Sequence, residues 1–125
     1  MQTIEIARNR WPEALREFSA IHDGWLVSLD VLSPEIGAQP EIANLPLLDV
    51  SADHVGDVGR VTISAGRTVD DHITHVIDSA TRLYVERTDK GADLALGIES
   101  ADGTKSILRF RATALPETVD GIVRR

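Results

Sequence analysis

The sequence predicts an α+β fold in which one N-terminal helix packs on a strongly bent antiparallel sheet of about six strands. Two observations support this prediction. Helical spacing of apolar residues is clear only over residues 10–22, whereas from residue 25 onward apolar and polar residues alternate in short runs separated by turns. We expect the 125 residues to form one domain, residues 1–125, because this length can bury a core without disulfides and the chain has no cysteine.

The helix is predicted from one apolar stripe on its surface. The stripe consists of Trp11, Ala14, Leu15, Phe18 and Ile21. These positions fall on a single face at helical spacing. Asn9 suits the N-cap, Pro12 suits the first turn, and Gly24 suits the end of the helix. We therefore expect a helix over about residues 10–22 whose stripe covers the sheet, with a partner-binding face as the alternative.

Strands are predicted wherever apolar residues alternate with polar ones. The segments are 25–31, 48–50, 61–63, 73–77 and 83–85. Ser33–Pro46 contains three prolines but also Ile36, Ile42 and Leu45, and we interpret it as a packed connection within the domain. Asp53–Gly59 contains two glycines and predicts a turn.

The last hairpin can be predicted to its register. A three-residue loop, Ala101–Gly103, would pair Ser100 with Thr104. In this register Leu94 lies opposite Phe110 and Leu96 opposite Leu108 on the apolar face. On the other face Glu99 lies opposite Lys105 and Asp93 opposite Arg111. A slip of one residue would mix the core with charged residues, so this register is favoured.

A tight turn at Lys90–Gly91 would add a third strand to this hairpin. It would pair Val85 with Leu96 and Leu83 with Ile98, which gives a meander with one apolar face. The helix can cover that face. A bent sheet of this kind resembles a small, partly open barrel of the Sm-like or SH3-like type.

Charge patterning argues against nucleic acid and membrane partners. The net charge is -7, and Glu17–Gly59 holds eight acidic residues without a Lys or Arg, which indicates a solvated acidic surface or a docking face for a basic partner. The basic residues near the C-terminus are Arg82, Arg87, Lys90, Lys105, Arg109 and Arg111. Cross-strand acids are expected to neutralise part of this cluster. No apolar window is long enough to span a membrane, and the N-terminus lacks a secretory pattern, so we expect a cytoplasmic protein.

The segment Asp70–His75 holds the candidate metal ligands. Asp71, His72 and His75 combine carboxylate and imidazole groups that suit a divalent metal. In a strand, however, His72 and His75 project to opposite faces and cannot share one ion without a bulge. His22 and His54 are expected to be structural or solvated, with His22 facing the C-terminal end of the helix dipole.

Catalytic motifs do not single out an enzyme. The sequence contains neither a Gly-x-Ser-x-Gly motif nor a phosphate-binding loop, and without cysteine it has no thiol nucleophile. We therefore expect no cofactor and no catalytic residue.

Five segments resemble a known family. They are Trp11–Pro12 with Phe18, Leu45–Ser51, Asp71–Ile77, Arg82–Glu86 and Ala101–Thr104. Together they span nearly the whole chain and are similar to a family of small, uncharacterised bacterial proteins of about this length, catalogued as a domain of unknown function. The resemblance implies a bacterial, cytoplasmic stand-alone domain and implies no activity.

These observations predict a non-enzymatic protein-interaction module. An edge strand or the acidic region 17–59 would engage another protein or a second copy of the chain. The alternative is a small-ligand- or metal-binding protein that uses His72, His75 and the nearby acids.

Overall fold

The computed structural model describes residues 1–55 and 58–111. The chain begins with β1 (Gln2–Glu5), a 3-10 turn η1 (Arg8–Arg10) and α1 (Trp11–Ile21). Six further strands follow: β2 (Leu26–Ser33), β3 (Gly37–Val55), β4 (Val58–Thr68), β5 (Asp71–Arg87), β6 (Asp93–Ser100) and β7 (Lys105–Arg111). The predicted combination of an N-terminal helix and an antiparallel sheet is confirmed, with β1 as a strand that the sequence patterning did not indicate.

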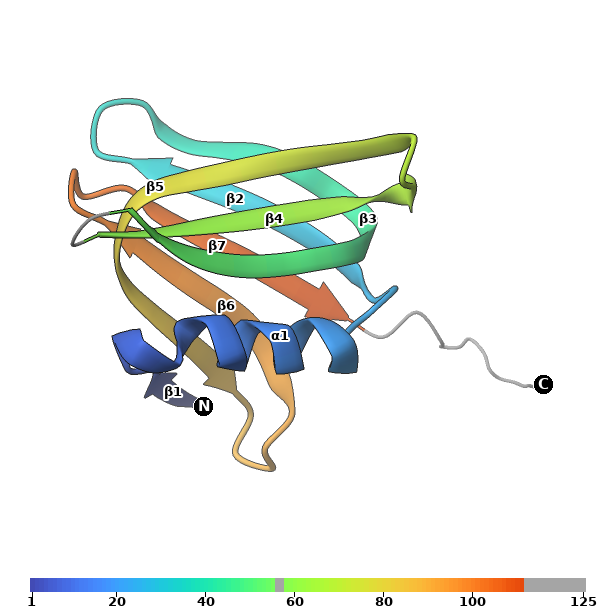
Figure 1. The fold of residues 1–125 in the computed structure, drawn as a ribbon, viewed down its shortest axis with the longest axis horizontal. Helices are drawn as coiled ribbons and strands as arrows, with labels where there is room; N and C mark the ends of the chain where they lie inside the picture. Colours follow the sequence, from blue (N-terminus) through green and yellow to red (C-terminus); the bar gives the residue numbers. More distant parts are fainter. Residues whose placement is uncertain (56–57, 112–125) are drawn as a thin grey trace.

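The seven strands form one antiparallel sheet that curls into a ring-like arrangement. The order is β1-β5-β4-β3-β2-β7-β6, and β5 also pairs with β6, so the pairing returns to its starting strand. β5 pairs with β4 through its first half and with β6 through its second half. Between the two halves Ser79 adopts a left-handed backbone conformation, with φ of 55°. Figure 1 shows β5 bending there, while α1 runs across one end of the ring.

α1 supplies the part of the core that closes this end of the ring. Trp11, Leu15 and Phe18 are buried, which confirms that the predicted stripe faces the sheet. Trp11 packs directly on Gly59, where an added Cβ would collide with the indole ring. Ser19 fastens the helix to β3, because its Oγ accepts a hydrogen bond from the Val50 N–H (2.9 Å) and donates one to the Val50 carbonyl (2.8 Å).

Both ends of the helix differ in detail from the prediction. Asn9 lies in the 3-10 turn, and Arg10 occupies the N-cap without a side-chain hydrogen bond. At the other end Ile21 is 67% exposed, so its place on the buried stripe was predicted wrongly. His22 is buried instead, because the helix ends at Ile21 and the following residue leaves the helical path.

The predicted register of the last hairpin is confirmed. Leu96 pairs with Leu108 and Glu99 with Lys105, and the Ser100 N–H donates to the Thr104 carbonyl. The meander is also confirmed, since Val85 pairs with Leu96 and Leu83 with Ile98. Leu94 is the exception, with 39% of its surface exposed.

A β-bulge explains the exposure of Leu94. Glu86 pairs with Ala95, but the next residue of β5, Arg87, pairs with Asp93, so Leu94 is an extra residue in β6. The bulge interrupts the alternation of side chains, turns Leu94 outward and re-aims Asp93. The expected pairing of Asp93 with Arg111 is therefore replaced by contacts of Asp93 with Arg87 and His22.

Ser33–Pro46, interpreted from sequence as a connection, forms instead the β2–β3 turn and the first part of β3. Pro40 and Pro46 pair with Asp30 and Leu26 in this ladder, which contains two register shifts. A proline is tolerated there because bulges and unpaired edges leave its missing N–H without a ladder partner. Ile42 is buried as a core residue, whereas Ile36 at the turn is 66% exposed.

We expect Phe110→Ala to lower the free energy of unfolding by about 3–5 kcal/mol, because Phe110 is buried against Phe18, His22 and Trp25. Urea denaturation followed by circular dichroism would measure the loss. The control is Lys105→Ala on the same strand, which removes only an exposed ion pair of 3.9 Å and should cost under about 1 kcal/mol. Similar losses in the two variants would contradict the observed packing.

Candidate functional site

The three predicted metal-ligand candidates lie on the first half of β5. His72 is exposed and pairs with Gly66, whereas His75 is half-buried and pairs with Ile63, whose side chain belongs to the core. Strand alternation places these two histidines on opposite faces. Asp71 begins the strand, four residues or about 13 Å from His75. Among residues 1–55 and 58–111 no group of three or more His, Asp or Glu side chains is arranged to hold a metal ion.

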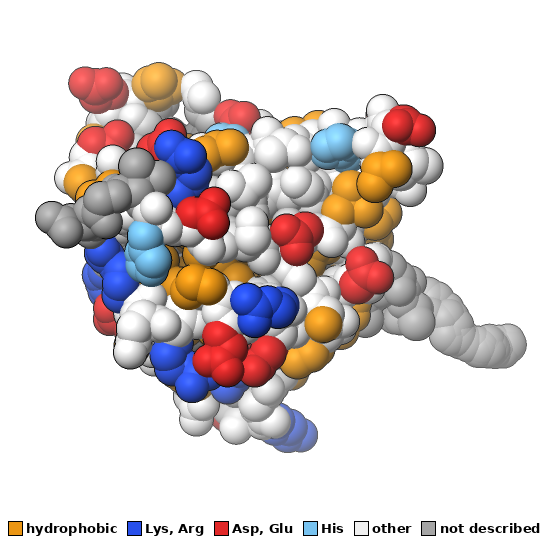
Figure 2. All heavy atoms as spheres, viewed as in Figure 1, with side chains coloured by type: hydrophobic (Ala, Val, Ile, Leu, Met, Phe, Trp, Pro, Cys, Tyr) orange, Lys and Arg blue, Asp and Glu red, His pale blue; other side chains and the backbone are white. Residues whose placement is uncertain are grey.

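The same half of β5 has an unpaired edge. One edge of Asp71–Asp78 pairs with β4, and β6 begins to pair with β5 only at Ala80. In the part of the chain that the structure describes, no strand pairs with the other edge of this segment. Ile73 is 44% exposed and Val76 47% exposed, and Figure 2 shows hydrophobic atoms at the surface around the β4–β5 turn. A sheet edge with exposed β-branched residues is a template for strand pairing.

A cavity of about 350 Å³, the edge groove, follows this unpaired edge. One wall is formed by five consecutive residues of β5, His75–Ser79. The other wall comes from the β6–β7 turn, residues 100–104, together with Val31 and Ser106. The groove therefore lies beside the first half of β5, before β5 begins to pair with β6. The β-branched composition of the strand is the only feature of the sequence that indicates this position.

Acidic side chains surround the edge groove. Asp78 and Asp102 line it, and Glu41 contacts His75 with 4.0 Å between Oε1 and Nδ1. The Thr104 backbone N–H donates a hydrogen bond to Asp102 (2.9 Å), and this bond lowers the pKa of Asp102 below its ordinary value. Arg60 pairs with Asp78 at 2.8 Å. Asp102 and Glu41 thus keep the groove acidic.

A second group of polar residues lies at the C-terminal end of α1. His22 is 2% exposed; its Nδ1 is 2.8 Å from the Phe18 carbonyl oxygen and its Nε2 is 3.2 Å from Asp93 Oδ2. Asp93 Oδ1 also accepts the Nε–H of Arg87 at 2.6 Å. Both oxygens that face the imidazole act as hydrogen-bond acceptors.

This chain of contacts is structural, and sequence reasoning found only part of it. The position of His22 at the helix end was expected, but its partner Asp93 was expected to face Arg111. The bulge at Leu94 brings Asp93 under the helix, and no sequence signal predicts that bulge. Phe18, Trp25 and Phe110 pack around the imidazole with ring centroids 4.1–4.8 Å away.

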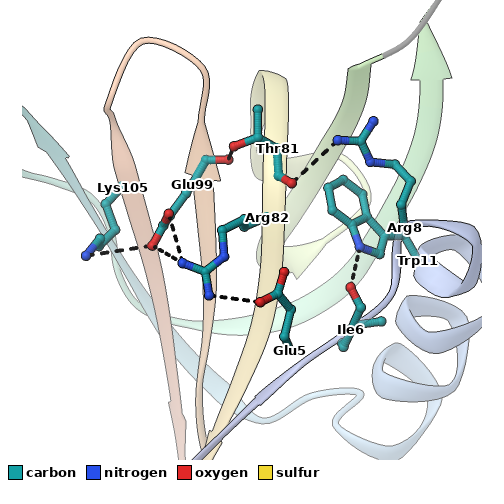
Figure 3. A network of polar contacts seen from close by, with 8 residues as sticks. All are labelled: Glu5, Ile6, Arg8, Trp11, Thr81, Arg82, Glu99 and Lys105. Carbon is teal, nitrogen blue, oxygen red and sulfur yellow. Dashed lines mark hydrogen bonds and ion pairs between the residues drawn. The ribbon is translucent and has the colours of Figure 1, made fainter.

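Four of the six clustered basic residues, Arg82, Arg87, Lys105 and Arg109, contact carboxylates. Figure 3 shows Lys105, Glu99, Arg82 and Glu5 forming a row across four strands, with contacts of 3.9, 3.4 and 2.9 Å between neighbours. The hydrogen bond that Arg82 donates to Glu5 raises the pKa of Arg82 above its already high ordinary value. Arg109 pairs with Asp30 at 2.7 Å, and Arg87 pairs with Asp93.

No helix among the described residues is long and apolar enough to cross a membrane.

Comparisons with known proteins give relatives without an assigned activity. A family model described as "Family of unknown function (DUF5335)" matches residues 2–118. The chain is also similar to an "Uncharacterized protein" of Aquifex aeolicus (strain VF5), with 31% identity over 118 residues that cover 94% of this chain and 100% of the relative. No solved structure matches the chain.

We expect Asp93→Ala to lower the free energy of unfolding by about 2–4 kcal/mol. The substitution leaves the buried His22 Nε2 without an acceptor and Arg87 without its carboxylate. Chemical denaturation would measure this loss. Asp89→Ala is the control, since Asp89 is 83% exposed and pairs only with the N-terminal amine; it should cost under about 1 kcal/mol. A loss no greater than that of the control would mean that the His22–Asp93–Arg87 contacts do not stabilise the fold.

We also expect no tight binding to duplex DNA or RNA. Duplex affinity comes mainly from cations that neutralise phosphates, and four of the six clustered basic residues already contact carboxylates. Fluorescence anisotropy at about 150 mM salt measures this affinity, a concentration at which long-range attraction is screened. Sub-micromolar binding that weakens in the double variant Arg109→Ala, Arg111→Ala would contradict the prediction.

Proposed function

The chain belongs to the DUF5335 family, a family of unknown function, and we propose that it acts as a non-enzymatic interaction module that binds an extended segment of another protein in the edge groove. The observation that carries this proposal is the unpaired edge of Asp71–Asp78 beside a cavity of about 350 Å³. Strand addition to such an edge is a recurring mode of peptide recognition.

The backbone of β5 would supply most of the affinity. In an antiparallel ladder, alternate residues direct their N–H and C=O groups toward one neighbour and the remaining residues direct theirs away. Along Asp71–Asp78 the groups directed toward β4 are paired, and those on the other edge are open to an incoming strand. Such a strand would fit against His75–Ser79 and face the β6–β7 turn.

Side chains beside the edge define the apolar positions of the partner. Val76 lines the groove and is 47% exposed, and Val31 adds apolar surface within it, whereas Ile77 points into the core and is 5% exposed. Because successive residues of an incoming strand point to opposite faces, only every second residue of the partner would meet this surface. We therefore infer a partner segment with apolar residues at alternate positions.

Charge selects a basic partner over a second copy of this chain. Asp102 and Glu41 lie beside the groove, and Asp71 and Asp78 stand at the two ends of the unpaired segment. Pairing of two copies through this edge would bring these acids together, and like charges across strands are unfavourable. Lys or Arg between the apolar positions of a different protein would complement them.

The proposal extends to the architecture and its setting. The β5–β6 pairing that completes the ring supports a small barrel of the Sm-like or SH3-like type, partly open along the edge groove. We retain the organisation as one domain over residues 1–125 and the cytoplasmic location as parts of the same proposal.

A short peptide that alternates Lys and Val tests the proposed strand addition. We expect saturable binding in fluorescence anisotropy, and we expect the peptide to slow amide hydrogen exchange within residues 71–79, because the open N–H groups become paired. The same peptide with Glu in place of Lys should bind at least about tenfold more weakly.

Two matched substitutions locate the binding site. Val76→Lys places a positive charge in the groove and should weaken binding of the Lys–Val peptide about tenfold or more. Val69→Lys makes the same change in the β4–β5 turn, at a residue 77% exposed and outside the groove lining, and should leave binding unchanged. Equal weakening in both variants, or unchanged exchange at residues 71–79, would refute strand addition. A wild-type dimer that Val76→Lys converts to a monomer would assign the edge to a second copy instead.

A further inference from the structure

A second cavity, the helix cavity, lies between α1, β1 and the adjoining ends of β5 and β6, and has a volume of about 440 Å³. We propose that it binds an aliphatic carboxylate, with the chain along α1 and the carboxylate at Arg10. The proposal is independent of the edge groove, because the two cavities share no lining residue.

The size and lining of the helix cavity suit a small amphiphilic molecule. Ligand sites in proteins commonly measure about 300–1,000 Å³ and combine apolar walls with a few polar groups. α1 contributes Ala14, Leu15 and Phe18, and the facing strands contribute Val85 and Leu96. Leu15 and Leu96 are fully buried behind the cavity, so the apolar surface that an alkyl chain can reach comes mainly from Ile4, Ile6, Ala7, Ala14 and Ile21.

Exposed apolar residues at the same cavity support this assignment. Ile4 and Ile21 line it and are 40% and 67% exposed. A bound alkyl chain would remove part of this surface from water, and each buried methylene group contributes favourably to binding.

The acids in the lining determine where an anionic group can bind. Glu5 is bonded to Arg82 at 2.9 Å, and Asp93 is bonded to Arg87 at 2.6 Å and contacts His22. These two carboxylates are therefore already neutralised. Glu17 has no partner among the described residues, so it would repel an anion bound beside the C-terminal half of the helix.

Arg10 stands at the opposite end of the lining and is the available cation. Its Nη2 is 3.6 Å from Glu13, and both side chains are more than half exposed, so this contact is weak and replaceable. A guanidinium can bind a carboxylate with two parallel hydrogen bonds. Arg10 and Glu17 are seven residues apart, about 10 Å along a helix, so a carboxylate on Arg10 avoids Glu17.

That separation also sets the length of the ligand. An alkyl chain of about 10 Å that starts at Arg10 would pass Ala14 and end near Phe18, about one turn short of Ile21. Octanoate has an extended length comparable with this span of roughly 10 Å and is a suitable probe. Butyrate covers about half of it.

Octanoate titration of the full chain, followed by amide chemical shifts, tests the proposal. We expect saturable shifts concentrated at the cavity lining, including Ala7, Ala14 and Leu96. The dissociation constant should be roughly millimolar or tighter, as expected for so small a ligand. Butyrate and 1-octanol should each bind at least about fivefold more weakly, since the first lacks the chain and the second lacks the charge.

A matched pair of variants identifies the arginine. Arg10→Gln should weaken octanoate binding about fivefold or more and leave 1-octanol binding unchanged. Arg16→Gln removes the same charge from α1 at an exposed position outside this cavity and should bind octanoate as the wild type does. The proposal is overturned if octanoate gives no saturable shifts, if 1-octanol binds as tightly as octanoate, or if Arg10→Gln binds octanoate as well as Arg16→Gln does.

Discussion

The bend of β5 is the constraint on which the rest of the structure depends. One strand of 17 residues pairs with β4 up to Ala80 and with β6 from Ala80 onward, so a single change of direction beside Ser79 closes the ring. Ser79 achieves this in the left-handed region, at φ of 55°, a conformation that costs free energy for a residue with a side chain. The pairing of β5 with β4 and with β6 offsets this free-energy cost. The Ala101 N–H also donates a hydrogen bond to the Ser79 carbonyl at 2.9 Å.

The bend has consequences at both halves of the strand. The first half diverges from β6, which leaves one edge of Asp71–Asp78 unpaired and opens the edge groove beside the β6–β7 turn. In the second half, β1 pairs with Tyr84–Arg87 on the edge of β5 opposite to β6. β1 also forms one wall of the helix cavity. Both candidate binding regions therefore arise because β5 pairs with different strands along its two halves.

Bulges place the polar residues that the ring encloses. In β6 the extra residue Leu94 turns outward and directs Asp93 toward the helix, where it meets His22 and Arg87. These two contacts offset the free energy needed to bury the carboxylate of Asp93, which would destabilise the fold if it had no partner. The same contacts neutralise one side of the helix cavity, so its electrostatics depend on Arg10 at the start of the helix and on Glu17 in its C-terminal half.

The sequence by itself determined the elements whose side chains repeat regularly. The helix over Trp11–Ile21 and the pairings of Leu96 with Leu108 and Val85 with Leu96 follow from periodicity, because one register alone separates apolar from charged faces. The same periodicity failed at Leu94 and Ile21, where a bulge and a helix end interrupt it. Tertiary structure alone decided the bend at Ser79, the unpaired edge beside it and the contact of His22 with Asp93. Bulges and left-handed residues depend on the strands that pack on either side, and that information is not contained in local residue patterns.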